Sequence, residues 1–342
     1  MTRRAVVLFN LGGPDKPEAV RPFLFNLFND PAIIGLPQPL RYLVAKLISG
    51  RRAPTAAAIY RQLGGGSPLL ANTRAQADAL QKQLGNDTRV FISMRYWHPM
   101  ARDAAVSAKA WGAEEVILLP LYPQFSTTTT GSSCADWNSA ATGAGLDVPT
   151  KTVCCYPSAD GFVQATAALI RPALEEARKT GRPRVLFSAH GLPKKVVRGG
   201  DPYQWQVERS AAAMVQALGE ADLDWVVCYQ SRVGPLEWIG PYTDGEIERA
   251  GRDRVPVVLV PIAFVSEHSE TLVELDIEYR HRAEQHGVPL YLRVPTVSAQ
   301  ESFIAELAGL VRTASQWPAG TCRSAHGERL CPANWTRCFA GP

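Results

Sequence analysis

The chain has 342 residues, of which 46% are hydrophobic and 20% are charged, the balance of a globular protein rather than of a disordered one. Its 36 Lys and Arg against 32 Asp and Glu leave a net charge of +4, and no block of five basic residues occurs, so we exclude a nucleic-acid-binding protein. The longest apolar run, residues 257–265, has nine residues, against the roughly 18 that a membrane-spanning helix needs. The apolar stretch behind the basic N-terminus, residues 5–9, is too short for a secretion signal, so we expect a cytoplasmic protein.

Short runs rich in β-branched and aromatic residues predict eight strands, at 5–10, 90–94, 115–121, 152–156, 185–189, 225–229, 256–264 and 290–294. Most are continuously apolar, as in parallel sheets covered by helices on both faces. Amphipathic helices are predicted between them, at 69–84, 101–112, 159–179, 202–218, 268–285 and 299–314. This alternation predicts a doubly wound α/β architecture, with the strands divided four and four about a boundary near residue 150.

The segment 23–52 is unusually dense in apolar residues and ends in Arg51 and Arg52. One interpretation is a helix pair packed against its domain. The other is an apolar lip around a hydrophobic ligand site, or a patch that lies on a membrane surface.

Polar turns with Gly or Pro follow the predicted strands, and the carboxyl ends of parallel strands are where ligands bind. His190 ends one strand, directly before Gly191 and Pro193, so its ring can enter a binding cleft. The alternative is a structural histidine bonded to a loop carbonyl.

A series of carboxylates follows the strand at 256–264. Glu267, Glu270, Glu274 and Glu278 have the spacing of one helix face, and burial of that face would raise some of their pKa values. Such a file suits proton transfer or a path for a hard cation. A solvated surface face is the alternative.

Arginines, tyrosines and a Gly-rich turn form a third set, at Arg52, Tyr60, Ser67, Arg95 and Tyr96. These residue types can hold carboxylates or phosphates. The turn at 64–66 lacks the Lys-Ser/Thr of a phosphate-binding loop, and residues 12–13 are no dinucleotide fingerprint, so nucleotide binding is not expected.

Three of the seven cysteines, Cys322, Cys331 and Cys338, lie near the C-terminus. His326 would complete a zinc site, whereas a fourth cysteine would complete an iron–sulfur site. For that fourth ligand we favour Cys134, because the start of a helix stabilises a thiolate. The remaining cysteines, at positions 154, 155 and 228, are expected in the core.

Taken in order, these motifs resemble the ferrochelatases over about residues 4–315. The motifs are the segments 10–14, 60–68, 95–99, 122–126, 188–193, 230–235 and 267–272. The resemblance implies two similar Rossmann-like domains, each with a four-stranded parallel sheet, at 1–150 and 151–316, with a porphyrin cleft between them. A cysteine-bearing extension at 317–342 would follow, as in ferrochelatases that hold a [2Fe-2S] cluster.

The family inserts Fe²⁺ into protoporphyrin IX to make protohaem, by distorting the macrocycle. The resemblance implies that His190 and Glu270 face each other across the macrocycle and share metal delivery and pyrrole proton removal, with Glu274 and Glu278 as a conduit. Which of the two takes the protons stays open. Substrate contacts are expected from Leu11, Arg52, Tyr60, Ser67, Arg95, Tyr96, Gln230, Trp238 and Phe264.

The chain departs from animal ferrochelatases in one respect, because the helix predicted at 159–179 lacks a cysteine. Cys134 therefore remains the preferred fourth ligand of the cluster, with Cys154 or Cys155 as alternatives. The lip at 23–52 implies peripheral membrane contact, and a homodimer stays open. The competing hypotheses are a chelatase for another tetrapyrrole or divalent metal, and a non-catalytic carrier of haem or an iron–sulfur cluster.

Overall fold

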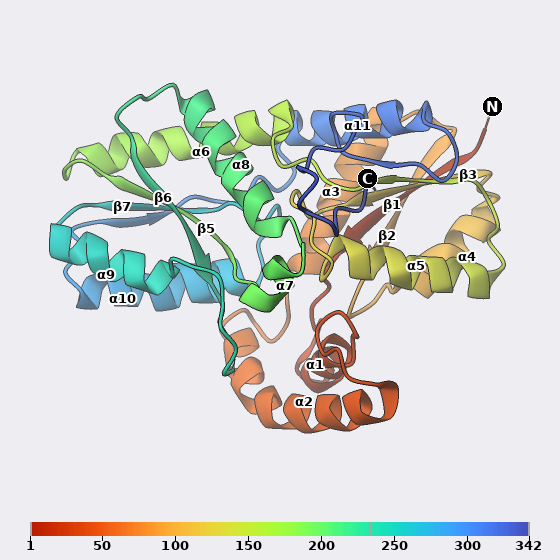
Figure 1. Ribbon diagram of the computed structural model, residues 1–342, viewed down its shortest axis with the longest axis horizontal. Helices are drawn as coiled ribbons and strands as arrows, with labels where there is room; N and C mark the ends of the chain where they lie inside the picture. Colours follow the sequence, from red (N-terminus) through yellow and green to blue (C-terminus); the bar gives the residue numbers. More distant parts are fainter. Residues whose placement is uncertain (1, 233, 341–342) are drawn as a thin grey trace. The chain divides into compact units, whose positions relative to one another are not determined.

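The computed structural model describes residues 2–232 and 234–340, which form two compact units. Unit 1 comprises Met1–Cys155 and Leu307–Glu328, and unit 2 comprises Tyr156–Glu306 and Arg329–Pro342. The chain therefore passes back to unit 1 after unit 2, and only the last segment returns to unit 2. Each unit is an α/β layer structure with its own parallel sheet (Figure 1).

The sheet of unit 1 is parallel and has the order β2-β1-β3-β4-β9. Its strands are β1 (Arg4–Asn10), β2 (Thr88–Met94), β3 (Glu115–Pro120), β4 (Thr150–Val153) and β9 (Cys322–Arg323). The four predicted strands of this half are confirmed, but the sheet has a fifth. The two-residue β9 pairs Thr152 with Cys322, and so short a strand carries no hydrophobic signal of its own.

The sheet of unit 2 is also parallel and has the order β6-β5-β7-β8. Its strands are β5 (Arg184–His190), β6 (Asp224–Gln230), β7 (Val257–Pro261) and β8 (Tyr291–Arg293). Counted in chain order within each unit, both sheets place the second strand beside the first, then the third and the fourth. The two units therefore repeat one topology, which confirms the doubly wound class.

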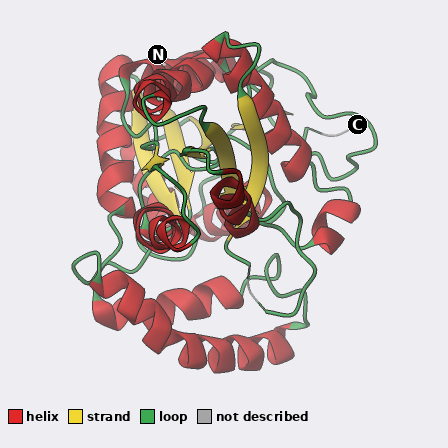
Figure 2. Cartoon of the chain, turned by 90° about the vertical axis from the view of Figure 1, so that its left-hand side faces the viewer, coloured by secondary structure: helices red, strands yellow, loops and turns green. Residues whose placement is uncertain are grey.

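The helices are drawn in red in Figure 2. Unit 1 contains η1 (Pro17–Ala19), α1 (Val20–Phe28), α2 (Gln38–Arg61), α3 (Leu69–Gln83), α4 (Ala101–Trp111) and α5 (Thr130–Ala144). Unit 2 contains α6 (Asp160–Arg178), α7 (Lys194–Arg198), α8 (Tyr203–Leu218), α9 (Thr243–Asp253), η2 (Glu270–Glu278) and α10 (Tyr279–Gln285). The helix α11 (Glu301–Ser315) begins in unit 2 and ends in unit 1.

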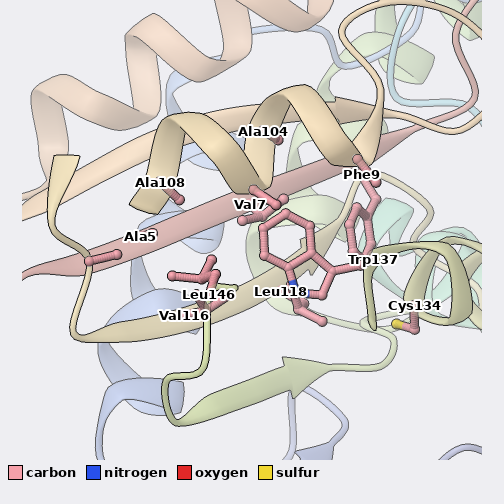
Figure 3. Close-up of a cluster of buried hydrophobic side chains, with 13 residues drawn as sticks. Ala5, Val7, Phe9, Ala104, Ala108, Val116, Leu118, Cys134, Trp137 and Leu146 are labelled. Atoms are coloured by element: carbon pink, nitrogen blue, oxygen red, sulfur yellow. The ribbon is translucent and has the colours of Figure 1, made fainter. Parts of the chain in front are cut away.

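One buried cluster of unit 1 lies between the sheet and the helices α4 and α5 (Figure 3). The rings of Phe9 and Trp137 meet there with centroids 6.4 Å apart. Alanines such as Ala104 and Ala108 give α4 a small-residue face, so the helix can approach β1 closely. Cys134 belongs to this same cluster and is 2% exposed.

The predicted helix at 268–285 is two elements, because residues Glu270–Glu278 form a π-helix before α10 begins. Leu275 of η2 and Ile247 of α9 are buried in one cluster with Leu186 and Leu259 of the sheet. This packing holds η2 against the sheet of unit 2. The sequence pattern could not distinguish the wider turn, since i and i+4 share a face in both helix types.

Candidate active site in unit 2

His190 and Glu270 are in direct contact in unit 2. His190 is the last residue of β5, and Glu270 is the first residue of η2, which follows the carboxyl end of β7. His190 Nδ1 lies 2.9 Å from Glu270 Oε2, and their side chains are 40% and 24% exposed. The resemblance implies that the two face each other across a bound macrocycle, and in this structure their side chains are in direct contact.

Gly191 allows the turn after His190 to pass close to its neighbours. A Cβ on Gly191 would lie 3.1 Å from the Gln230 carbonyl oxygen and 3.2 Å from Cε3 of Trp238. The indole of Trp238 therefore lies against the turn that carries His190. The indole nitrogen is buried and has no hydrogen-bond partner in the structure.

Ser231 joins the two carboxylates of the site. Its backbone N–H donates to Glu274 Oε1 at 2.9 Å, and its hydroxyl contacts both Glu274 and Glu270, the latter at 3.3 Å. Gln230 donates to Glu274 Oε2 at 3.3 Å. Ser231 has φ +64°, a left-handed conformation that is uncommon outside Gly. The sequence analysis missed this residue, although it sits in a polar turn at the end of β6.

His268 is a further residue of the site. It is 7% exposed, and its Nε2 lies 4.0 Å from Glu270 Oε1. The Phe264 ring lies 4.7 Å from the His268 ring, so this predicted substrate contact borders the site through His268. His268 lies in the 267–272 motif of the sequence, but it is not among the residues predicted to be catalytic.

The predicted helix face of four carboxylates is wrong for Glu267, because the helix begins at Glu270. Glu267 turns to Arg293, whose Nη1 lies 2.6 Å from Glu267 Oε1. Glu270 and Glu274 both contact Ser231, and Glu278 lies on the same helix at the exposed surface.

The environment gives the ionisable groups of the site very different proton affinities. Burial alone would lower the pKa of His190, but the charge of Glu270 and the hydrogen bond to it outweigh burial and raise this pKa above 6.5. Burial alone would raise the pKa of Glu270, but His190 holds it well below 4.5. Burial, and then the charge of Glu270, raise the pKa of Glu274. The site therefore has a carboxylate that stays ionised beside two groups that can hold a proton.

Arg95, a predicted substrate contact, makes its polar contacts within unit 1. Its guanidinium Nη2 lies 2.9 Å from Asp30 Oδ2, and its Nε donates to the Ser132 hydroxyl at 2.7 Å. Tyr96 is 1% exposed, and its hydroxyl donates to Asp30 Oδ2 at 2.8 Å. These partners satisfy both side chains within the unit, and they tie the turn after α1 to α5.

The other substrate-contact candidates of unit 1 lie around its apolar cluster or on α2. Leu11 and Tyr60 pack with Phe23 and Leu24 of α1. The Ser67 hydroxyl accepts the backbone N–H of Leu69 at 3.3 Å, at the start of α3. Arg52 is an exposed residue of α2, so it is the one charged candidate of this unit that the solvent reaches freely.

The apolar segment at 23–52 forms most of α1 and more than half of α2, and it has a buried part and an exposed part. Val20, Phe23 and Leu24 of α1 are buried. By contrast, Leu40, Leu43 and Leu47 of α2 are 55%, 62% and 53% exposed. Figure 1 shows these two helices as a neighbouring pair at the bottom of the view. Within residues 2–232 and 234–340, no helix combines the length and apolar character needed to cross a bilayer.

The cysteines proposed as cluster ligands fall into two pairs. Cys134 and Cys322 belong to unit 1, where the charge of one affects the other, and Cys331 and Cys338 of unit 2 are hydrogen-bonded to each other. Burial raises the pKa of Cys134, which opposes the thiolate expected from its place in α5. Among the described residues, no three His, Cys, Asp or Glu side chains gather as a metal site.

Solved structures with a similar fold are known. SirB from Bacillus subtilis with Fe³⁺ has a similar fold, with a TM-score of 0.56 at 13% sequence identity, and the match covers 93% of this chain and 100% of SirB. The sirohydrochlorin chelatase SirB from Bacillus subtilis subspecies spizizenii in complex with cobalt matches with a TM-score of 0.54 at 10% identity, covering 92% and 96%. The chain thus has the fold of a chelatase.

The sequence comparisons identify the family. The family model Ferrochelatase matches residues 3–315. The ferrochelatase of Phenylobacterium zucineum is 54% identical over 338 residues, which are 96% of this chain and 97% of that protein. The chain belongs to the ferrochelatase family, and it is an enzyme of haem biosynthesis in the metal–porphyrin chelatase class of lyases.

Proposed function

We propose that the chain inserts Fe²⁺ into protoporphyrin IX to form protohaem, and that His190 and Glu270 carry the chemistry. The observation that supports this assignment best is the contact of 2.9 Å between the two side chains at the carboxyl end of the unit 2 sheet. Imidazole and carboxylate groups are both ligands for divalent iron and both accept protons. The pair therefore provides the two functions that metal insertion requires.

The geometry favours His190 as the proton acceptor. An ionised Glu270 only accepts hydrogen bonds, so Nδ1 of a neutral His190 carries the hydrogen of their contact. Nε2 is then left with its lone pair and can take a pyrrole proton. The carboxylate of Glu270 stabilises the imidazolium that forms, as in other paired general bases.

The full reaction releases two protons as Fe²⁺ replaces them in the macrocycle. One goes to His190, and the second passes to the carboxylates that Ser231 holds together, where the raised pKa of Glu274 suits a proton carrier. Binding energy from the rest of the macrocycle distorts the ring, which exposes its nitrogen lone pairs to the metal.

An anaerobic absorbance time course with protoporphyrin IX and Fe²⁺ tests this proposal. We expect the free-porphyrin bands to convert to haem bands with the wild type and to persist with His190→Ala. His98→Ala is the matched control, because His98 also pairs with a carboxylate, at 3.2 Å from Asp103, but is exposed in unit 1. Binding of porphyrin without metal insertion by the wild type would favour another metal or a carrier. Faster insertion into a different tetrapyrrole would favour the alternative chelatase.

We propose in addition that Cys134, Cys322, Cys331 and Cys338 hold a [2Fe-2S] cluster. Four thiolates are the donor set that such a cluster needs. The cluster would supply one-electron chemistry and would fix the tail to the fold. Iron and sulfide analysis of each Cys→Ser variant tests the set, and a cluster that survives Cys134→Ser would favour Cys154 or Cys155. Zinc in place of iron would favour the alternative site with His326.

We further propose that α2 lies on a membrane surface while the enzyme works in the cytoplasm. Leu40, Leu43 and Leu47 supply exposed apolar contacts, and Arg51 and Arg52 supply positive charge next to them. Flotation with anionic vesicles should recover the wild type and lose a Leu43→Gln/Leu47→Gln variant. Light scattering of the same samples decides between a monomer and a homodimer.

A further inference from the structure

The guanidinium of Arg293 contacts the chain on both sides of the segment that carries Glu270 and Glu274. Arg293 ends strand β8, and its side chain is 9% exposed. Its Nη1 lies 2.6 Å from Glu267 Oε1, and its Nη2 pairs with the carboxylate of Asp276. Glu267 precedes Glu270 by three residues, and Asp276 follows Glu274 by two, so the two ion pairs enclose the working part of η2.

Glu267 and Asp276 have different further neighbours, and Arg293 is the ion-pair partner that they share. Glu267 Oε1 also accepts the backbone N–H of Thr296 at 2.9 Å, which ties the turn before η2 to the chain after β8. Asp276 has a second cationic neighbour in Arg280, at 3.6 Å, but that side chain is 45% exposed. Arg293 touches both acids, because the planar guanidinium presents two donor nitrogens at once.

A π-helix is rare and is found frequently at functional sites, so the contacts that flank η2 bear directly on the geometry of this site. We propose that Arg293 is a positioning residue for metal insertion, which holds the π-helical turn of η2 in the register that places Glu270 against His190 and Glu274 against Ser231. Arg293 does not touch these four side chains. This inference rests on the proposed function of the His190–Glu270 pair.

Substitution of Arg293 by lysine separates positioning from charge. Arg293→Lys keeps one positive charge but has a single nitrogen, which cannot reproduce the two separate contacts that Nη1 and Nη2 make with Glu267 and Asp276. We expect kcat for iron insertion to fall about 10-fold or more while KM for protoporphyrin changes less than about 3-fold, because misplacement of a reacting group is felt in the chemical step. The matched control is Arg280→Lys, which alters the exposed partner of the same Asp276, and we expect its kcat within about 2-fold of the wild type.

The ring resonances of His190 provide a readout that a structural role alone would not move. They are assigned among the six histidines by their loss in His190→Ala. In the porphyrin-free protein, we expect Arg293→Lys to shift them and Arg280→Lys to leave them in place. If Arg293→Lys changes neither kcat nor these resonances, the proposal is overturned.

A neutral variant covers the case in which Arg293→Lys does not fold. Arg293→Met/Glu267→Gln/Asp276→Asn removes the three charges of the two ion pairs together, and the ion that loses its acidic neighbour, Arg280, is exposed to solvent. We expect it to fold and to lose kcat, and a folded triple variant with the kcat of the wild type would overturn the proposal. A failure of the proposed function would give a different result. His190→Ala would then insert iron at the rate of the wild type, whereas Arg293→Lys would still shift the His190 resonances.

Discussion

Asp30 allows a quantitative test of the finding that Arg95 is an internal side chain. Asp30 is 3% exposed, and its Oδ2 receives Arg95 at 2.9 Å, the Tyr96 hydroxyl at 2.8 Å and the Ser132 hydroxyl. Asp30→Asn removes the charge and leaves the guanidinium of Arg95 without its buried partner. Breaking a buried ion pair from one side costs about 3–5 kcal/mol, and because Arg95 is 17% exposed we expect the lower end, about 3 kcal/mol.

Calorimetry gives the corresponding change in unfolding temperature. A unit of this size loses roughly 2–4 °C for each kcal/mol, so Asp30→Asn should lower Tm by about 6–12 °C. The control is Asp136→Asn, since Asp136 also faces Arg95 but at 3.6 Å and with 35% exposure, and it should cost less than about 1 kcal/mol. Equal effects of the two variants would refute the assignment, and Arg95 would return as a candidate for binding the propionates of the porphyrin.

Three further predictions concern the site in unit 2. The pKa of His190, read from its ring resonances, should lie above 6.5 in the wild type and fall in Glu270→Gln, because burial then acts without the opposing charge of Glu270. The imidazole of the variant would therefore stay neutral to lower pH. An unchanged titration midpoint of His190 would exclude the ion pair. Ser231→Gly should be more stable to denaturant than Ser231→Ala by about 1 kcal/mol, since both lose the hydroxyl but only Gly accepts φ +64° without strain. Gly191→Ala should lower kcat, because the added Cβ must displace Trp238 or the Gln230 carbonyl, and unaltered kinetics would show that the turn adapts.

Sequence reasoning predicted the strands well because each one is a continuous apolar run. It missed β9 and α9 because neither element has such a run. Two residues cannot show a period, and α9, Thr243–Asp253, is so polar that only a few of its residues, such as Ile247, mark the buried face. Both elements are defined by their neighbours, β4 in the first case and the unit 2 sheet in the second.

The site was predictable in its residue types but not in its geometry. His190 and Glu270 stand out because each follows a buried strand, at the edge where ligands bind in parallel sheets. Their direct contact, the turn of Glu267 toward Arg293 and the role of Ser231 depend on the π-helical register and on a left-handed backbone conformation. Neither feature leaves a local pattern, because both are imposed by tertiary contacts.

The central claim, that His190 takes a pyrrole proton, is tested most directly by chemical rescue of His190→Ala. Anaerobic single-turnover insertion of Fe²⁺ into protoporphyrin IX would be followed with and without added imidazole, which can fill the space of the missing ring. We predict that His190→Ala inserts iron at least about 100-fold more slowly than the wild type and that imidazole restores part of the rate, with a dependence on pH that follows free imidazole. Insertion by His190→Ala at the rate of the wild type, without imidazole, would contradict the account.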